Sequence, residues 1–123
     1  MTQGTIKTYR DLVVWQKAME FVTDVYVASK TFPQDEMYGL TSQIRRCAIS
    51  MPSNIAEGFG RKTPNEFIRF LQIAMGSLFE MQTQLEIALN LSYLTEAKHA
   101  DLHEKTREIE RMLSSLIRSI RTR

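Results

Sequence analysis

The segment 43–62, QIRRCAISMPSNIAEGFGRK, carries the side chains best suited to chemistry. If this segment is a helix, five polar side chains fall within an arc of about 100°. These five residues, here called the polar stripe, are Arg46, Ser50, Asn54, Glu57 and Arg61. Short or forked polar groups suit fixed hydrogen bonds, whereas a solvated helix face is more often rich in lysine and glutamate. Three interpretations remain open: a solvated face, a contact between subunits, or a site for a ligand or nucleic acid.

Pro52 lies in the middle of the same segment. Proline has no amide hydrogen, so it leaves the carbonyl of Ala48 without its helical partner. A proline inside a plain helix costs about 3 kcal/mol and bends the helix axis. We therefore expect a bend at Pro52 that the surrounding packing favours.

Residue types that build catalytic or metal sites are few. Glu96, His99 and His103 share a spacing that can hold one ion, but di-iron bundles need a second carboxylate–histidine pair. Cys47 lies on the apolar side of its helix, which favours a buried hydrophobe over a reactive thiol. No Ser/His/Asp set and no phosphate-binding loop can be assembled. We therefore expect no metal, no cofactor and no enzymatic activity.

Cationic side chains form a further group, although the formal net charge is only +2. The segment 111–123 contains four arginines and no acid. Cations near a helix C-terminus favour the helix dipole, and they also attract phosphate. The candidates for phosphate contact are Arg45, Arg46, Arg61, Lys62, Arg69, Arg118, Arg121 and Arg123.

The positions of these residues depend on four amphipathic helices, which apolar periodicity predicts at 11–30, 38–59, 64–92 and 95–121. Asp11 is a suitable N-cap for the first helix. Thr63 and Glu66 flank Pro64 in the pattern of a capping box. Gly58 or Gly60 supplies the stop of the second helix. Short connections predict an antiparallel up-down-up-down four-helix bundle as a single domain over residues 1–123.

Two details of the apolar pattern go beyond a simple bundle. The first helix has two apolar rows that together cover about half of its circumference, which is wider than one bundle face needs. In the third helix, Gly76 and Ser77 interrupt the pattern, which suggests a close backbone approach.

The bulk composition is that of an ordinary soluble domain, with 123 residues, 43% hydrophobic and 24% charged. The single cysteine fits a reducing compartment, and the segment MTQGTIKTYRD lacks the apolar core of a signal peptide. No apolar stretch is long enough to span a membrane. We therefore expect a cytoplasmic protein with no membrane partner.

The segments DLVVWQKAMEF, FPQDEMYGLTSQIRRCAISMPSNIAEGFGRK, EFIRFLQIAMGSLFEMQTQLEIA and LSYL resemble the four-helix bundle family of 23S rRNA intervening-sequence proteins. The resemblance extends from about Tyr9 to Ile117. Its most specific part, YGLxxQxRRxxxSxPxNIAEG, matches from Tyr38 to Gly58. The chain is also similar to the accessory variability determinant of diversity-generating retroelements, a more basic bundle that assists a reverse transcriptase.

The resemblance implies the bundle fold and a ring-like homopentamer, but it implies no catalytic residue. It therefore favours a non-enzymatic oligomeric bundle that acts as an accessory protein, with RNA or a nucleic-acid enzyme as partner. Two alternatives remain: a purely structural or protein–protein interaction oligomer, and a small-ligand-binding protein that uses the polar stripe.

Overall fold

The computed structural model describes residues 5–123, so the first four residues of the expected domain lie outside the described part. It contains four α-helices, α1 (Val13–Ser29), α2 (Leu40–Phe59), α3 (Pro64–Asn90) and α4 (Glu96–Arg121). Two short 3-10 turns, η1 (Tyr9–Asp11) and η2 (Gln34–Glu36), precede α1 and α2. No strand occurs within residues 5–123, which confirms the all-helical class. No helix in the described part of the chain is long and apolar enough to cross a membrane.

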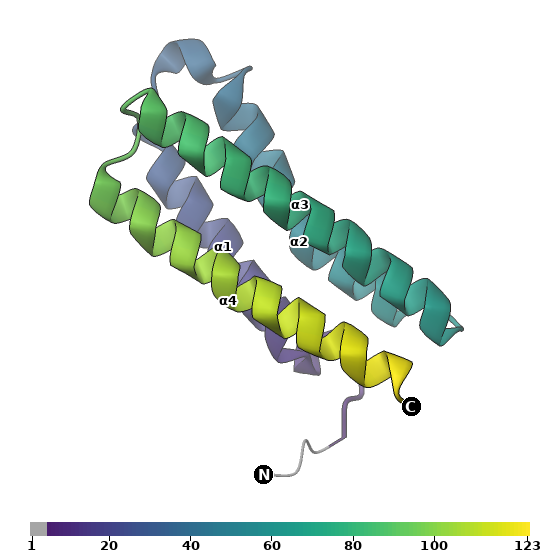
Figure 1. Ribbon diagram of the computed structural model, residues 1–123. Coiled ribbons are helices and arrows are strands. Elements are labelled where there is room, and N and C mark those ends of the chain that lie inside the picture. Colours follow the sequence, from purple (N-terminus) through teal and green to yellow (C-terminus); the bar gives the residue numbers. More distant parts are fainter. Residues whose placement is uncertain (1–4) are drawn as a thin grey trace.

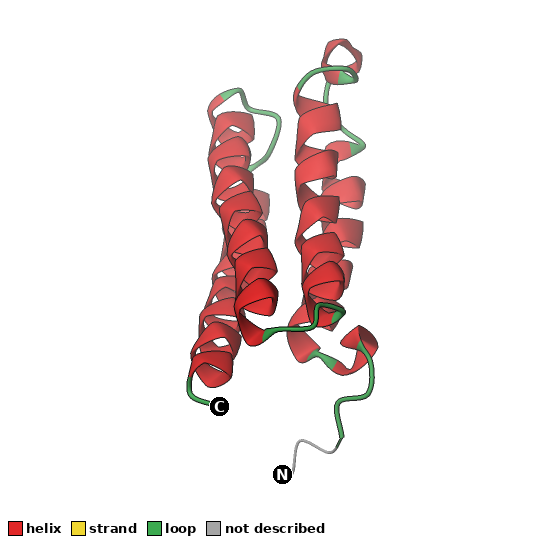
Figure 2. Ribbon diagram, turned by 90° about the vertical axis from the view of Figure 1, so that its right-hand side faces the viewer, coloured by secondary structure: helices red, strands yellow, loops and turns green. Residues whose placement is uncertain are grey.

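The helices lie side by side, and their connections gather at two ends (Figures 1 and 2). The α2–α3 connection lies at the same end as the C-terminus and η1. The α1–α2 and α3–α4 connections lie at the opposite end. This arrangement brings residues from 61–62 and from the end of α4 to one end of the molecule.

The two apolar rows of α1 have different environments. Val14, Ala18, Phe21 and Val25 are buried in the core shared by all four helices. Met19, from the other row, keeps 43% of its surface exposed. The wide apolar face of α1 therefore divides into a core row and a row at the molecular surface.

The start of α1 differs from the prediction, because its N-cap is Leu12 and not Asp11. Asp11 ends η1, where its carboxylate accepts from the amides of Lys7 (2.8 Å) and Thr8 (3.0 Å). The Thr8 hydroxyl in turn accepts from a backbone amide, which completes a capping box one turn earlier. Asp11 therefore stabilises the turn before the helix, and these amide donors lower the pKa of its carboxyl.

The start of α3 follows the predicted pattern in part. The Thr63 hydroxyl accepts from the Glu66 amide at 3.1 Å, and Pro64 is the first helical residue. The Glu66 carboxylate accepts from the Thr63 hydroxyl at 3.0 Å. The same hydroxyl therefore caps the helix and holds the glutamate.

Two glycines have roles other than those predicted. Gly58 is buried inside α2, and a Cβ atom there would lie 2.7 Å from the Cβ of Phe70 in α3. The predicted close approach at Gly76 is wrong, since a Cβ there would meet no described atom within 4 Å. Gly60 caps α2 with a right-handed φ of −81°, so the left-handed cap typical of glycine is not used. The glycine that lets α2 and α3 approach closely is therefore Gly58.

Pro52 lies within α2, which continues as a helix from Leu40 to Phe59. Its ring is buried on the side of α2 that faces α1. The bend expected at this residue stays a prediction.

Candidate functional site: the polar stripe and the basic end

The middle of the polar stripe joins α2 to α3. The Ser50 and Ser77 hydroxyl oxygens lie 2.7 Å apart. The Asn54 side-chain amide donates to the Ser50 carbonyl (2.8 Å) and to the Ser50 hydroxyl oxygen (3.0 Å). Ser77 is the functional partner that sequence reasoning missed, although the Gly76–Ser77 interruption of α3 marked its position. These three side chains therefore satisfy one another within the bundle.

Cys47 lies beside this network and is 5% exposed. Its thiol donates to the carbonyl of Ser77 at 3.0 Å. Burial, followed by the nearby Glu80 carboxylate, raises the pKa of the thiol to about 12. The expectation of a buried hydrophobe is confirmed, since a thiol that stays protonated at neutral pH is a poor nucleophile.

The C-terminal part of the polar stripe remains at the surface. Arg61 forms an ion pair with Glu57 at 2.8 Å, with 40% and 55% of the two side chains exposed. The Arg61 guanidinium also lies 4.6 Å from the centre of the Phe70 ring. Exposed pairs at this helical spacing contribute only about 0.2–0.5 kcal/mol. Arg46, at the other end of the polar stripe, is exposed.

Arg45 is engaged within the bundle. Its Nε donates to the Ser29 hydroxyl oxygen at 2.8 Å, and its guanidinium lies 4.7 Å from the centre of the Tyr26 ring. Both partners belong to α1, so Arg45 joins α2 to α1. This engagement leaves Arg45 less free than Arg46 to contact phosphate.

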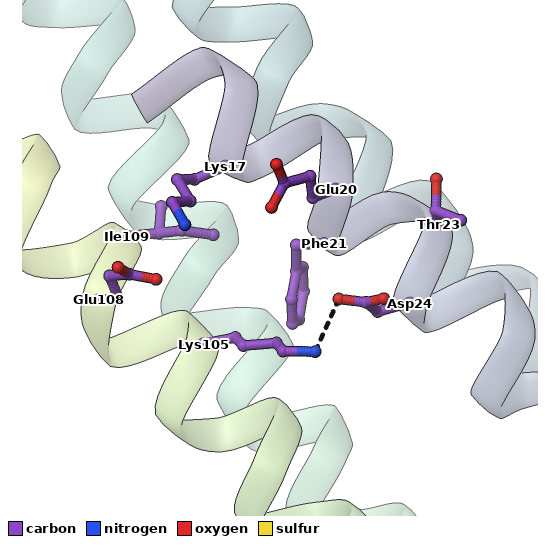
Figure 3. Close-up of a pocket in the computed structure, with 8 residues that line it drawn as sticks. All are labelled: Lys17, Glu20, Phe21, Thr23, Asp24, Lys105, Glu108 and Ile109. Atoms are coloured by element: carbon purple, nitrogen blue, oxygen red, sulfur yellow. Dashed lines mark hydrogen bonds and ion pairs between the residues drawn. The ribbon is translucent and has the colours of Figure 1, made fainter. Parts of the chain in front are cut away.

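A charged groove of about 410 Å³ lies between α1 and α4 (Figure 3). Lys105 in α4 forms ion pairs with Asp24 of α1 at 3.0 Å and with Asp101 at 3.4 Å. The hydrogen bond to Asp24 is the main cause that raises the pKa of Lys105. Other lining residues include Lys17, Glu20 and Glu108, so cations and carboxylates occur together. This balance makes the groove a poor site for an anion.

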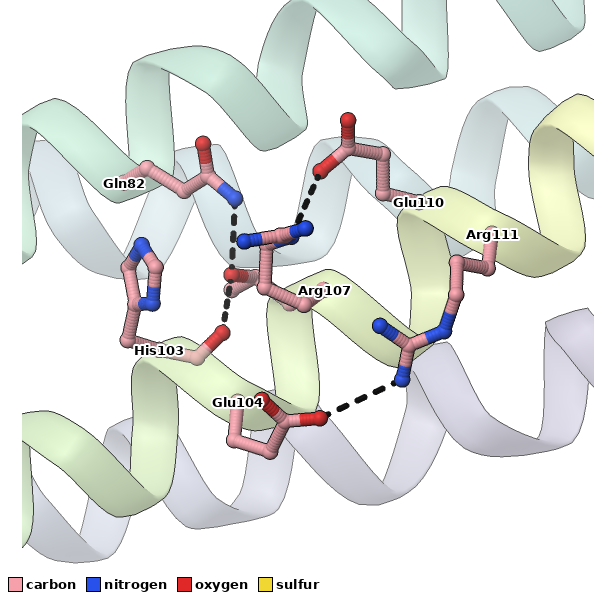
Figure 4. Close-up of polar contacts among 7 residues, drawn as sticks. Gln82, His103, Glu104, Arg107, Glu110 and Arg111 are labelled. Carbon is pink, nitrogen blue, oxygen red and sulfur yellow. Dashed lines mark hydrogen bonds and ion pairs between the residues drawn. The ribbon is translucent and has the colours of Figure 1, made fainter.

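The arginines in the central part of α4 are also neutralised (Figure 4). Arg107 pairs with Glu110 at 3.6 Å, and Arg111 pairs with Glu104 at 3.2 Å. Nearby, Gln82 of α3 donates to the Thr106 hydroxyl oxygen at 3.0 Å. Positive charge in this part of α4 is therefore compensated locally.

The two histidines stack on α4, with 5.7 Å between the ring centroids of His99 and His103. Among residues 5–123, no three His, Cys, Asp or Glu residues lie close enough together to hold a metal ion. The stacked pair has no third ligand in the described part of the chain.

The end of the molecule with the C-terminus has a different charge distribution. We call it the basic end and define it by Arg10, Arg61, Lys62, Arg118, Arg121 and Arg123. Its nearby carboxylates are already engaged: Asp11 by backbone amides, Glu57 by Arg61 and Glu66 by Thr63. Of the basic-end residues, only Arg61 forms an ion pair with another residue in 5–123.

The structure therefore divides the predicted phosphate-contact residues. Arg61, Lys62 and the three C-terminal arginines lie at the basic end, and Arg69 follows in the second turn of α3. Arg45 and Arg46 lie in the first half of α2, towards the opposite end. The eight residues do not form one continuous surface.

The fold and the side-chain arrangement define an all-helical protein with four helices, an internal polar network and a basic end. The chain belongs to the family of 23S rRNA-intervening sequence proteins, whose family model matches residues 10–115. It is also similar to a solved protein of unknown function from the S23 ribosomal protein family of Bacteroides thetaiotaomicron VPI-5482. That similarity has 26% identity and a TM-score of 0.79, and it covers 86% of this chain and 96% of the other. No curated protein matches the chain.

Proposed function

We propose that the protein is a non-enzymatic cytoplasmic accessory protein that binds RNA through its basic end. The observation that carries this proposal is the gathering of cations from η1, the α2–α3 connection and the end of α4. Most of these cations have no carboxylate partner among residues 5–123, so their charge is available to phosphate. Family membership supports a link to rRNA genes, and RNA is a partner that such a surface fits.

The test is a mobility-shift titration of single-stranded RNA over a salt series. We expect the logarithm of the association constant to fall linearly with the logarithm of the salt concentration between ~50 and ~200 mM. A double variant Lys62→Gln/Arg123→Gln should bind more weakly and with a shallower slope. The matched control is Lys30→Gln/Lys98→Gln, which removes the same charge from the opposite end. Undetectable binding at ~50 mM salt, or equal weakening by both double variants, contradicts the proposal.

We also infer that the protein acts as an oligomer, with an antiparallel up-down-up-down bundle as the subunit and a ring-like homopentamer as the assembly. A surface groove of about 300 Å³ between α1 and α2 supports this inference. Its lining is largely apolar and includes Trp15, Met19, Val22, Ile49 and Pro52. Ile49 is 42% exposed, so a neighbouring subunit would bury apolar area here. A purely structural oligomer is the second candidate function.

Native mass spectrometry tests the assembly directly. Ile49→Glu places a charge in the α1–α2 groove and should shift the mass towards the monomer. Val27→Glu is the control, because Val27 is exposed on α1 but does not line the groove. A monomeric wild-type protein, or equal masses for wild type and Ile49→Glu, contradicts assembly through this surface. RNA binding that is absent from an intact oligomer would favour the structural function.

A further inference from the structure

A small pocket lies between α3 and α4, outside the polar stripe. Its volume is about 310 Å³, and its lining is Gln72, Ser114, Ile117, Arg118 and Arg121. Ser114, Arg118 and Arg121 share one face of α4 because their spacings are four and three residues. Gln72 comes from α3, so the two helices supply opposite walls of the pocket.

The chemistry of this lining is one-sided. Two guanidinium groups, one side-chain amide and one hydroxyl can donate hydrogen bonds, and no carboxylate lines the pocket. The α1–α4 groove of Figure 3 makes an informative contrast, because lysines and carboxylates line it together. Arg118 and Arg121 also differ from Arg107 and Arg111, which pair with glutamates in Figure 4.

We propose that the α3–α4 pocket binds a phosphate group and is a subsite for the RNA backbone at the basic end. The forked guanidinium groups of Arg118 and Arg121 suit the oxygens of a phosphate. The amide of Gln72 and the hydroxyl of Ser114 add neutral donors on either side. This subsite rests on the proposed RNA-binding function, although inorganic phosphate presents the same chemistry.

The end of α4 sets a limit on the affinity for a single phosphate. Its last carbonyl groups carry partial negative charge, which opposes an anion near the helix C-terminus. The two arginines offset this charge, so we expect weak binding of an isolated phosphate. An RNA chain makes further contacts to the other basic-end residues, so the pocket contributes one contact among several.

The decisive variant is Gln72→Glu, which places a carboxylate opposite both arginines with little change in size. Gln34→Glu is the matched control, because it makes the same change at an exposed residue in η2, at the opposite end. Arg118→Gln/Arg121→Gln removes the cations themselves. Circular dichroism and melting temperature check that each variant is folded. Fluorescence anisotropy with a short single-stranded RNA then measures the affinity and its salt dependence.

We expect Gln72→Glu to weaken RNA binding roughly tenfold at ~50 mM salt, with Gln34→Glu close to wild type. The double arginine variant should reduce the salt slope by about 2, one for each lost phosphate contact. If wild type binds RNA and both pocket variants bind as Gln34→Glu does, the pocket is overturned while the proposed function stands.

A second arm separates the two sources of phosphate. The side-chain amide signal of Gln72 in a ¹⁵N–¹H spectrum is followed during titration with sodium phosphate at constant ionic strength. A saturable shift that sodium chloride does not produce supports the pocket, even if wild type binds no RNA and the proposed function fails. If neither inorganic phosphate nor RNA moves this signal, the pocket is overturned.

Discussion

Replacing Gly58 with alanine should destabilise the protein, whereas Gly76→Ala should stabilise it. Both glycines lie inside helices, where alanine is favoured by about 1 kcal/mol. At Gly58 the new methyl group would lie 2.7 Å from the Cβ of Phe70 and 3.1 Å from Cδ1 of Phe67. The Phe70 atom next to the backbone cannot rotate away, so α2 and α3 must separate. At Gly76 the methyl group would meet no described atom within 4 Å.

The magnitudes follow from two opposing contributions. Overpacking in a well-packed interior costs about 1–3 kcal/mol, which exceeds the propensity gain over most of that range. We expect a net loss of about 1–2 kcal/mol for Gly58→Ala and a gain of up to about 1 kcal/mol for Gly76→Ala. For a chain of this size, 1 kcal/mol shifts the melting temperature by roughly 3–5 °C.

The assay is urea and thermal unfolding at one fixed protein concentration, because assembly contributes to apparent stability. Native mass is checked first, so that only variants with the wild-type assembly state are compared. A Gly58→Ala protein as stable as wild type would refute the argument from close approach. A Gly76→Ala protein of wild-type mass but lower stability would contradict the open space around Gly76.

Three further predictions test the polar network and the helix cap. Cys47 should resist alkylation in the native protein and react on unfolding; because its pKa is raised from 9.0 to about 12, stability should decline as pH rises from about 9 towards 12, and Cys47→Ser should weaken this decline. Ser50→Ala and Ser77→Ala should each cost about 0.5–1.5 kcal/mol in urea unfolding, and the double variant should cost less than their sum; additive losses would show that the hydroxyls do not interact. Thr63→Ala should cost about 1 kcal/mol through loss of the α3 N-cap, whereas Thr63→Ser should stay near wild type; equal losses in both variants would contradict the capping role.

Local features of the fold were predictable because they depend on residues close in sequence. Helical periodicity located the four helices to within a few residues at each end. The Thr63 cap depends on an amide three residues away, and the sequence pattern identified it. Asp11 was assigned to the wrong turn because the Thr8–Asp11 capping box and an N-cap on α1 use the same side-chain chemistry.

Features that depend on the neighbouring helix were not predictable in the same way. A helical wheel places Gly58 and Gly76 on faces of their own helices, but it does not give the distance to the next helix. The Ser50–Ser77 contact and the Lys105–Asp24 pair join residues 27 and 81 positions apart. The phosphate pocket likewise needs Gln72 beside α4, which the sequence of either helix alone does not specify.

The structure also changes the meaning of the polar stripe. Ser50 and Asn54 bond to each other and to α3, Cys47 donates to α3, and Gly58 lets the two helices approach. On the opposite side of α2, Pro52 and Arg45 face α1. Much of the distinctive segment 43–62 is therefore occupied in fixing α2 between its neighbours.

This occupation has a consequence for experiments on the segment. A substitution at Ser50 or Asn54 removes internal hydrogen bonds, so it lowers stability whatever the protein binds. Loss of RNA binding in such a variant would therefore not identify a contact with RNA. Gln72, Arg118 and Arg121 line a surface pocket and lie outside this network, so they can be changed with less effect on the fold. A binding defect confined to these positions, at unchanged melting temperature, would assign recognition to the basic end and positioning to the segment 43–62.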